Sequence, residues 1–368
     1  MILYVLVAAG TVLLCQMVNN HYVRTGNGIS RQQMLNILCL SAVFLILFAL
    51  SACRLNVGND YAKYVEFMHL VYCDAYVPTE IGFNLTVSFL YAISGFENFL
   101  LVFAVFAVFT VLLFLAAIYK QADSFGFSFF LFMAFGYYFQ SFNTVRYYLA
   151  LAIALYVIPY VIRKEWVKFV LLTLLGATFH KSLLVILPLY FLASLCWKRW
   201  QLFLAAAFCT TFFFCQDFYL KVVMFLYPTY EDTEYLEGGT SYISIIRCLG
   251  VLLFSLICYR QTVRDSRRNR FYFYCNLGAL ALYVCCSFLP IISRIGYYLT
   301  ITHILFLPAL LGGITNQKLR RLFTAGVVTA AILYFIMFMG RTGENGLRIL
   351  PYETFLFHDM VPILSDVN

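Results

Sequence analysis

The chain has 368 residues, of which 63% are hydrophobic and only 11% are charged. Soluble domains are about 45–50% apolar and about 25% charged, so this composition excludes an ordinary soluble protein. The net charge of +8 does not indicate a nucleic-acid-binding surface, because the basic residues are divided among short loops between apolar runs.

Apolar runs of roughly 17–25 residues recur along the chain, and each is long enough to cross a bilayer as a helix. Only helices and closed barrels satisfy the backbone in lipid, and these runs are too long and too irregular for barrel strands. We therefore predict an all-α, polytopic integral membrane protein with about ten full transmembrane helices plus re-entrant or half helices, forming one integral membrane domain over residues 1–368. Full spans are predicted at residues 2–18, 34–53, 99–119, 125–142, 143–162, 201–217, 241–259, 271–290, 295–313 and 322–340.

Basic residues set the predicted orientation, because loops rich in Lys and Arg stay cytoplasmic. The strongest such loop contains Arg260, Arg264, Arg267, Arg268 and Arg270. Counting spans outward from this loop places 54–98, 218–240 and 341–368 on the extracytoplasmic side. Because this count places the whole of 54–98 on one side, the short apolar stretch 81–95 cannot cross the bilayer. It is therefore predicted to be re-entrant or interfacial.

The run at residues 169–196 is predicted to be a hairpin. Basic groups flank it on both sides, with Arg163 and Lys164 before it and Lys198 after it. If both groups are cytoplasmic, the run enters and leaves on the same side. At about 1.5 Å per residue it then forms two half-length helices, with its tip, Phe179-His180-Lys181-Ser182, pointing toward the extracytoplasmic side.

Four basic residues remain on the side that the positive-inside rule disfavours: Arg146, Lys181, Arg247 and Arg294. A side chain that snorkels at a helix end explains one such residue. Four of them together with His180 indicate a polar cavity and a substrate path. Arginine suits a phosphate or pyrophosphate because its planar fork donates two parallel hydrogen bonds, and lysine adds a point charge.

Several other side chains are candidates for a site. His180 suits proton transfer near neutral pH, with a helix-cap or packing role as the alternative. Asp60 follows Gly58-Asn59, so it is either a functional carboxylate or part of a turn or helix cap. Glu80 is placed to cap or charge the start of the next helix.

Tyrosines, including Tyr61 and Tyr147, gather near the predicted outer interface. They fit the aromatic belt of a membrane protein, and an aromatic cavity with polar tips also suits sugar rings. The sequence contains no nucleotide-binding glycine motif and no metal-ligand cluster, so we expect no cofactor and no metal.

Several short motifs occur along most of the chain. They are Gly58-Asn59-Asp60-Tyr61, Glu80-Ile81-Gly82-Phe83, Asn143-Thr144-Val145-Arg146 with Leu149-Ala150, Phe179-His180-Lys181-Ser182, Arg294 and Leu350-Pro351-Tyr352. In these motifs and their order the chain resembles the EpsG family, relatives of the Wzy-type polymerases of O-antigen, capsule and exopolysaccharide. One departure is Tyr147, where the family often has a glutamine.

The resemblance implies a membrane glycosyltransferase similar to C-type enzymes, located in the bacterial inner membrane with its active face extracytoplasmic. Such enzymes polymerise oligosaccharide repeat units carried on undecaprenyl pyrophosphate. The expected partners are the lipid-linked glycan donor and acceptor, membrane lipid, a chain-length regulator and other polysaccharide assembly proteins, with no nucleic acid.

These implications give each candidate residue an expected role. Pyrophosphate is expected to bind the cations Arg146 and Arg294, with Lys181 or Arg247, and Arg146 would also stabilise its charge as it leaves. Either His180 or Asp60 is expected to deprotonate the acceptor hydroxyl. The glycan is expected to contact Tyr61, Tyr147 and Glu80.

There are three alternatives to a polymerase. A flippase or transporter of lipid-linked glycans would bind the same pyrophosphate, but it would also show an inverted repeat and charges at mid-membrane depth, and neither is clear in the sequence. An outer-face acyltransferase would use His180 with a hydroxyl acceptor, although four cations favour phosphate over a thioester. A non-catalytic assembly partner is the third alternative.

Overall fold

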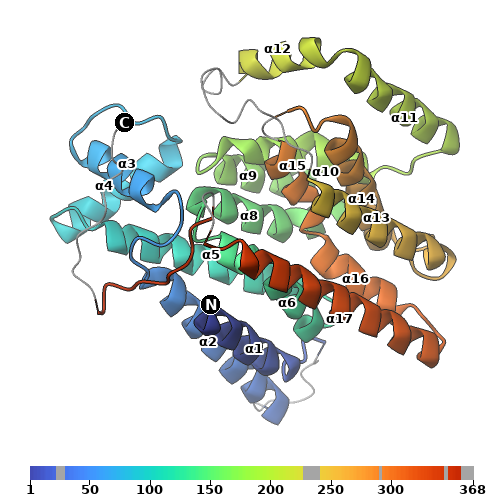
Figure 1. The fold of residues 1–368 in the computed structure, drawn as a ribbon, viewed down its shortest axis with the longest axis horizontal. Helices are drawn as coiled ribbons and strands as arrows, with labels where there is room; N and C mark the ends of the chain where they lie inside the picture. The colour runs from blue at the N-terminus through green and yellow to red at the C-terminus, as the bar shows by residue number, and fades with distance from the viewer. Residues whose placement is uncertain (22–29, 227–240, 290–291, 344–346, 358–368) are drawn as a thin grey trace. The chain divides into compact units, whose positions relative to one another are not determined.

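The computed structural model describes residues 1–21, 30–226, 241–289, 292–343 and 347–357. The protein is 77% helical, and an antiparallel bridge between Arg54 and Thr354 is its only β pairing in these ranges. The all-α class predicted from the apolar runs is confirmed (Figure 1).

Seventeen α-helices are described, and five helical stretches are long and apolar enough to cross a membrane. The five stretches are α2 (Arg31–Ala52), α5 (Phe99–Gln121), α8 (Val145–Ile162), α15 with α16 (Ile292–Gly312) and α17 (Gln317–Gly340). The other helices are α1 (Ile2–Gln16), α3 (Tyr61–Tyr72), α4 (Ile81–Ser94), α6 (Phe125–Ala134), α7 (Tyr137–Gln140), α9 (Trp166–Ala177), α10 (Ile186–Ser194), α11 (Arg199–Phe214), α12 (Gln216–Leu226), α13 (Tyr242–Ile257) and α14 (Arg267–Cys285).

Some predicted full spans are shorter or divided in the structure. The run at residues 125–142 forms α6 and α7, which are separated at Gly136. Gly136 has a φ of +74°, and a Cβ there would lie 3.0 Å from the ring of Phe338. A left-handed conformation favours glycine, so this residue both breaks the helix and admits the neighbouring ring.

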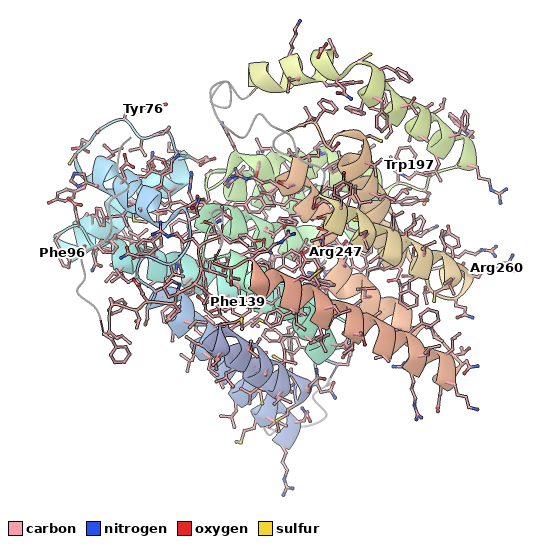
Figure 2. The ribbon with its side chains drawn as sticks, viewed as in Figure 1. Tyr76, Phe96, Phe139, Trp197, Arg247 and Arg260 are labelled. Atoms are coloured by element: carbon pink, nitrogen blue, oxygen red, sulfur yellow. The ribbon has the colours of Figure 1, made fainter. Side chains whose placement is uncertain are left out.

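The described chain divides into two compact units. The first contains residues 1–157, 171–183 and 316–368, and the second contains residues 158–170 and 184–315. In the first unit α1 packs against α2 and α6, and α2 packs against α5. Phe139, fully buried on α7 (Figure 2), packs against the ring of Tyr4 with 5.1 Å between the ring centroids.

The segment predicted as a polar outer loop, 54–98, contains two helices packed against each other, α3 and α4. The buried face of α3 carries Tyr61, Tyr64, Val65 and Met68, a spacing of three and four residues that marks one side of a helix. No continuous apolar run marks α3 in the sequence, because polar residues occupy its other side. The predicted apolar piece 81–95 matches α4 closely.

The C-terminal tail runs along the loop that precedes α3. The N–H groups of Leu55 and Gly58 donate to the carbonyl oxygens of Glu353 and Arg348, at 3.0 and 2.9 Å. Tyr4 Oη donates to the carbonyl oxygen of Ile349 at 2.6 Å. This part of the predicted tail is therefore fixed to the first unit. Of the predicted outer segment 218–240, the portion 227–240 lies outside the described residues.

The predicted hairpin at residues 169–196 forms two short helices, α9 and α10, joined through a 3₁₀ turn at Lys181–Val185. Within the second unit, the rings of Trp166 and Phe191 lie 5.5 Å apart, and those of Phe169 and Tyr190 lie 6.3 Å apart. The beginning of α9 therefore lies beside the end of α10, and the chain reverses direction as predicted.

Candidate functional site

An ion pair between Arg146 and Glu80 forms the centre of the candidate site in the first unit. Arg146 lies in the first turn of α8, and its Nη1 donates to Glu80 Oε2. The two side chains are only 14% and 17% exposed. Glu80 Oε1 also accepts the backbone N–H of Lys181 at 3.1 Å, so this carboxylate joins three separate segments of the chain.

Glu80 is held in place by the packing of the helix that follows it. It occupies the N-cap position of α4, but its side chain makes no capping hydrogen bond. Of the two predicted roles, capping the helix or placing a charge at its start, the first is therefore not observed. Two residues later, Gly82 donates its N–H to the carbonyl oxygen of Thr178 at 2.8 Å. A Cβ at Gly82 would lie 2.5 Å from Thr178 Oγ1, so only glycine permits this approach.

Aromatic rings surround the Arg146 guanidinium. Its Cζ lies 5.6 Å from the centroid of the Tyr64 ring and 5.2 Å from that of Phe83. A cation at this distance over a ring gains electrostatic stabilisation. Arg146 Nε is buried and has no hydrogen-bond partner in the part of the chain that the structure describes. The guanidinium therefore retains a donor that its present contacts do not use.

His180 lies at the tip between α9 and α10, beside the first turn of α8. The rings of His180 and Tyr147 meet edge-on with 5.5 Å between their centroids. His180 Nδ1 lies 2.7 Å from Ser182 Oγ, and the backbone N–H of Ser182 also points to Nδ1, at 3.4 Å. An N–H can only donate, so this contact favours the tautomer that carries its proton on Nε2.

The structure thus brings Arg146, Glu80, Tyr147 and His180 together, with the backbone of Lys181. The Lys181 side chain itself is exposed. Arg146 and His180 are 34 residues apart in the sequence, and the turn before the 3₁₀ segment returns His180 to the start of α8. Their chemical roles stay predictions.

Asp60 approaches this group from the loop before α3. It occupies the N-cap position of α3, where its carboxylate makes no capping bond, and its N–H donates to Asn143 Oδ1 at 3.0 Å. Gly58 has a φ of +106°, and a Cβ there would lie 2.5 Å from the carbonyl oxygen of Phe142. The glycine therefore lets the Asp60 loop lie directly against the chain that leads into α8.

Tyr64 connects Asp60 with Arg146 electrostatically. Burial raises the pKa of the Tyr64 hydroxyl, Arg146 opposes that rise, and Asp60 adds to it. Burial also raises the pKa of Tyr61 to about 12, against the opposing effect of Arg54. Both phenols are therefore protonated at neutral pH and serve as hydrogen-bonding groups.

Arg54 is a buried cation that was not among the residues predicted for the site. It is 1% exposed, and its Cζ lies 5.0 Å from the centroid of the Phe103 ring and 5.2 Å from that of Phe142. Its Nη1 donates to Ser51 Oγ at 2.9 Å. In the sequence Arg54 follows directly after an apolar run. A basic residue in this position is common at the ends of membrane helices, so it did not indicate a buried cation. The guanidinium of Arg54 packs against Phe142, the residue before Asn143.

The remaining predicted cations, Arg247 and Arg294, belong to the second unit. Arg247 lies on α13 (Figure 2) and acts electrostatically on His303 of α16. His303 is fully buried, and its Nε2 lies 2.8 Å from Asn276 Oδ1, as expected for a core histidine. The grouping of Arg247 and Arg294 with Arg146 stays a prediction.

Among the described residues, no group of three or more His, Cys, Asp and Glu side chains is arranged to hold a metal ion. The side chains that gather at the site are a guanidinium, carboxylates, an imidazole and phenols. Such a set binds phosphate groups, orients hydroxyl groups and transfers protons.

Comparison with known proteins identifies a family. The sequence model of the EpsG family matches residues 37–354, a range that includes every site residue named above. The family comprises Wzy-like polysaccharide polymerases and exopolysaccharide biosynthesis proteins. No curated protein matches the chain, and neither does any solved structure.

Proposed function

The chain belongs to the EpsG family, and we propose that it is a glycosyltransferase that polymerises undecaprenyl-pyrophosphate-linked repeat units. We place its active face on the extracytoplasmic side of the bacterial inner membrane. The single observation that carries the proposal is the Arg146–Glu80 pair beside His180, at the ends of apolar helices. The pyrophosphate of a lipid-linked donor lies at the surface of the bilayer. The cation that binds it must therefore lie at the end of a membrane helix, where the lipid can reach it.

Arg146 is proposed to exchange Glu80 for the pyrophosphate of the donor. The guanidinium already holds one oxyanion, and phosphate oxygens present the same acceptor geometry to its fork. Its buried Nε has no partner in the described chain, so an additional bond is available to a phosphate. During the reaction the bond from the anomeric carbon to the pyrophosphate breaks, and Arg146 stabilises the negative charge on the leaving group.

The acceptor hydroxyl supplies the new glycosidic bond and must lose its proton. Of the two residues predicted for this step, we propose Asp60 as the proton acceptor. The contacts of His180 Nδ1 with Ser182 favour a ring that carries its proton on Nε2, and that tautomer donates a hydrogen bond. His180 would then bind an oxygen of the donor, while Asp60, beside Tyr64, accepts the proton.

The test is an R146A variant in a strain that lacks the chromosomal copy. Removing a donor that stabilises the departing charge lowers such rates by about 100-fold or more, so we expect single repeat units on lipid at the outer face and no long polymer. R163A is the matched control, because Arg163 follows the other end of α8 and is largely exposed. Normal-length polymer at a normal level of R146A protein would refute the proposal.

Two further outcomes separate the alternatives. Repeat units that accumulate at the cytoplasmic face of the R146A strain would identify a transporter instead of a polymerase. D60N should lose polymer as R146A does, while H180Q, which keeps a hydrogen-bond donor, should retain more activity than D60N. The reverse order would assign proton transfer to His180.

A further inference from the structure

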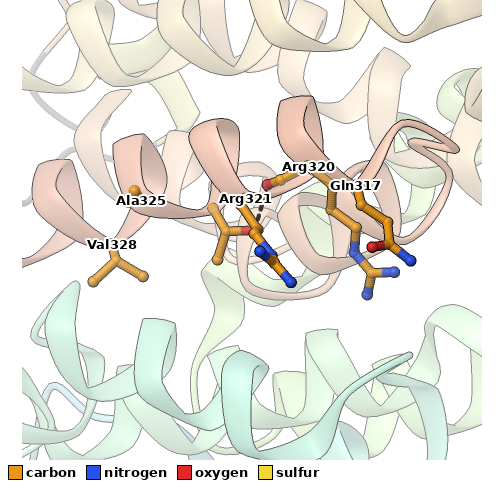
Figure 3. Close-up of a pocket in the computed structure, with 6 residues that line it drawn as sticks. Gln317, Arg320, Arg321, Ala325 and Val328 are labelled. Atoms are coloured by element: carbon orange, nitrogen blue, oxygen red, sulfur yellow. Dashed lines mark hydrogen bonds between the residues drawn. The ribbon is translucent and has the colours of Figure 1, made fainter.

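The first two turns of α17 form a basic face that the proposed reaction does not use. Gln317, Arg320, Arg321 and Thr324 lie three and four residues apart, which places them on one side of the helix. Together with Ala325 and Val328 they line a hollow of about 550 Å³. Figure 3 shows Gln317, Arg320 and Arg321 extending from the same side of the helix.

The guanidinium groups of Arg320 and Arg321 have no anionic partner among the residues that the structure describes. None of the ion pairs among the described residues involves Arg320 or Arg321, and the lining of the hollow contains no acidic residue. The hydrogen bonds formed by Arg320 with other described residues use its backbone: its N–H donates to Asn316, and its carbonyl oxygen accepts from Thr324 Oγ1 at 2.8 Å. The face is therefore positive and unneutralised.

Beyond Arg321, toward the C-terminal end of α17, the same face becomes apolar. Ala325 and Val328 follow Arg321 along the helix, and from Arg320 to Val328 the helix advances about 12 Å at 1.5 Å per residue. The helix continues to Gly340, and only 17% of its most apolar window is buried inside the protein. A positive end followed by an exposed apolar surface of membrane length is complementary to a lipid with an anionic headgroup.

We infer that this face of α17 binds the phosphate headgroup of an anionic phospholipid, with its acyl chains lying along Ala325 and Val328. The two arginines donate to the phosphate oxygens in the way guanidinium groups bind such anions, and Gln317 and Thr324 add neutral polar contacts. A soluble anionic protein would match the arginines but not the apolar surface that continues beneath them. The occupant is therefore a lipid.

The experiment measures lipid binding to the purified full-length protein in detergent, by titration with phosphatidylglycerol or phosphatidylcholine and native mass spectrometry. We expect phosphatidylglycerol to bind more tightly than phosphatidylcholine. R320Q/R321Q should weaken phosphatidylglycerol binding about 30-fold, from about fivefold per arginine at an anionic surface. Both side chains are exposed, so the variant should fold normally, as its thermal unfolding would verify.

K198Q/R199Q is the matched control, because Lys198 and Arg199 are also exposed basic residues at the start of an apolar helix, α11. Phosphatidylglycerol binding to this control should change less than about twofold, well below the fivefold per arginine expected at α17. Equal affinity for the two lipids, or an equal loss in both variants, would overturn the inference. Displacement of phosphatidylglycerol by millimolar inorganic phosphate would also overturn it, since the site would then recognise the free ion.

Discussion

At the scale of single residues, the candidate site depends on two glycines that allow segments to approach closely. Gly58 brings the Asp60 loop against Phe142, and Gly82 brings the start of α4 against Thr178. In each case the nearest atoms include backbone, which cannot move aside as a flexible side chain does. These positions explain why the short motifs around Asp60 and Glu80 each contain a glycine.

Gly82 offers a direct test of this packing. G82A would place a Cβ 2.5 Å from Thr178 Oγ1 and 2.7 Å from the Thr178 carbonyl oxygen, so α4 and Glu80 must shift. We expect a loss of about 1–3 kcal/mol in the free energy of unfolding, as for other overpacked positions, together with reduced polymer. The measurements are the thermal unfolding of purified protein and the polymer length in cells.

G10A on α1 is the control for this prediction, because nothing lies within 4 Å of a Cβ at Gly10. Its unfolding temperature should remain at or above that of the unmodified protein, since alanine favours a helix more than glycine does. A G82A protein as stable and active as G10A would show that the contact with Thr178 does not position Glu80.

At the scale of elements, the hairpin of α9 and α10 is the feature on which the predicted membrane topology of residues 169–196 depends. The two helices have 12 and nine residues, each shorter than the roughly 17 residues needed to cross a bilayer. The ring contacts between the start of α9 and the end of α10 show the reversal. Basic residues before and after the hairpin are consistent with both ends on the cytoplasmic side.

Two native cysteines test this topology. Cys73, after α3, and Cys196, after α10, both have exposed side chains. A membrane-impermeant maleimide added to intact spheroplasts should label Cys73 but not Cys196, with C73S and C196S variants used to identify the labelled peptides. Labelling of Cys196 from outside would reject the same-side hairpin, and protection of Cys73 would reject an extracytoplasmic position for α3.

The C-terminal tail is the second element on which the site depends. Its backbone bonds to the 53–59 loop, which leads directly to Asp60. Truncation after residue 343 removes these bonds, so we expect a lower unfolding temperature and little polymer. Truncation after residue 357 leaves every described contact of the tail in place and should preserve both. Equal polymer from the two truncated proteins would show that the tail does not support the loop.

At the scale of the whole molecule, the sequence predicted the class and most helices because long apolar runs have few alternatives in lipid. It did not predict α3, whose apolar positions repeat within a polar segment. It also did not pair Arg146 with Glu80, since the two residues are 66 positions apart and no local pattern encodes such a contact. The proximity of His180 to α8 was predicted, because the basic residues on both sides of the hairpin place its two ends on the same side of the membrane.

The proposed reaction makes a prediction for the entire protein. The pyrophosphate of the donor is itself the activated leaving group, so purified protein with lipid-linked repeat units should form polymer without ATP or a nucleotide sugar. The product would be measured by its length distribution after electrophoresis, with R146A protein as the inactive control. Polymer that forms only after a nucleotide sugar is added would identify a different donor.

The bonds between the tail and the 53–59 loop also have a consequence for the order in which the protein is made. Gly58 leaves the ribosome well before its hydrogen-bond partner, the carbonyl oxygen of Arg348, has been synthesised. At about 5–20 residues per second, the intervening chain takes about 15–60 seconds to translate. During that interval the loop before Asp60 lacks its partners in the tail, so a nascent chain completes these bonds only after residue 353 has been synthesised.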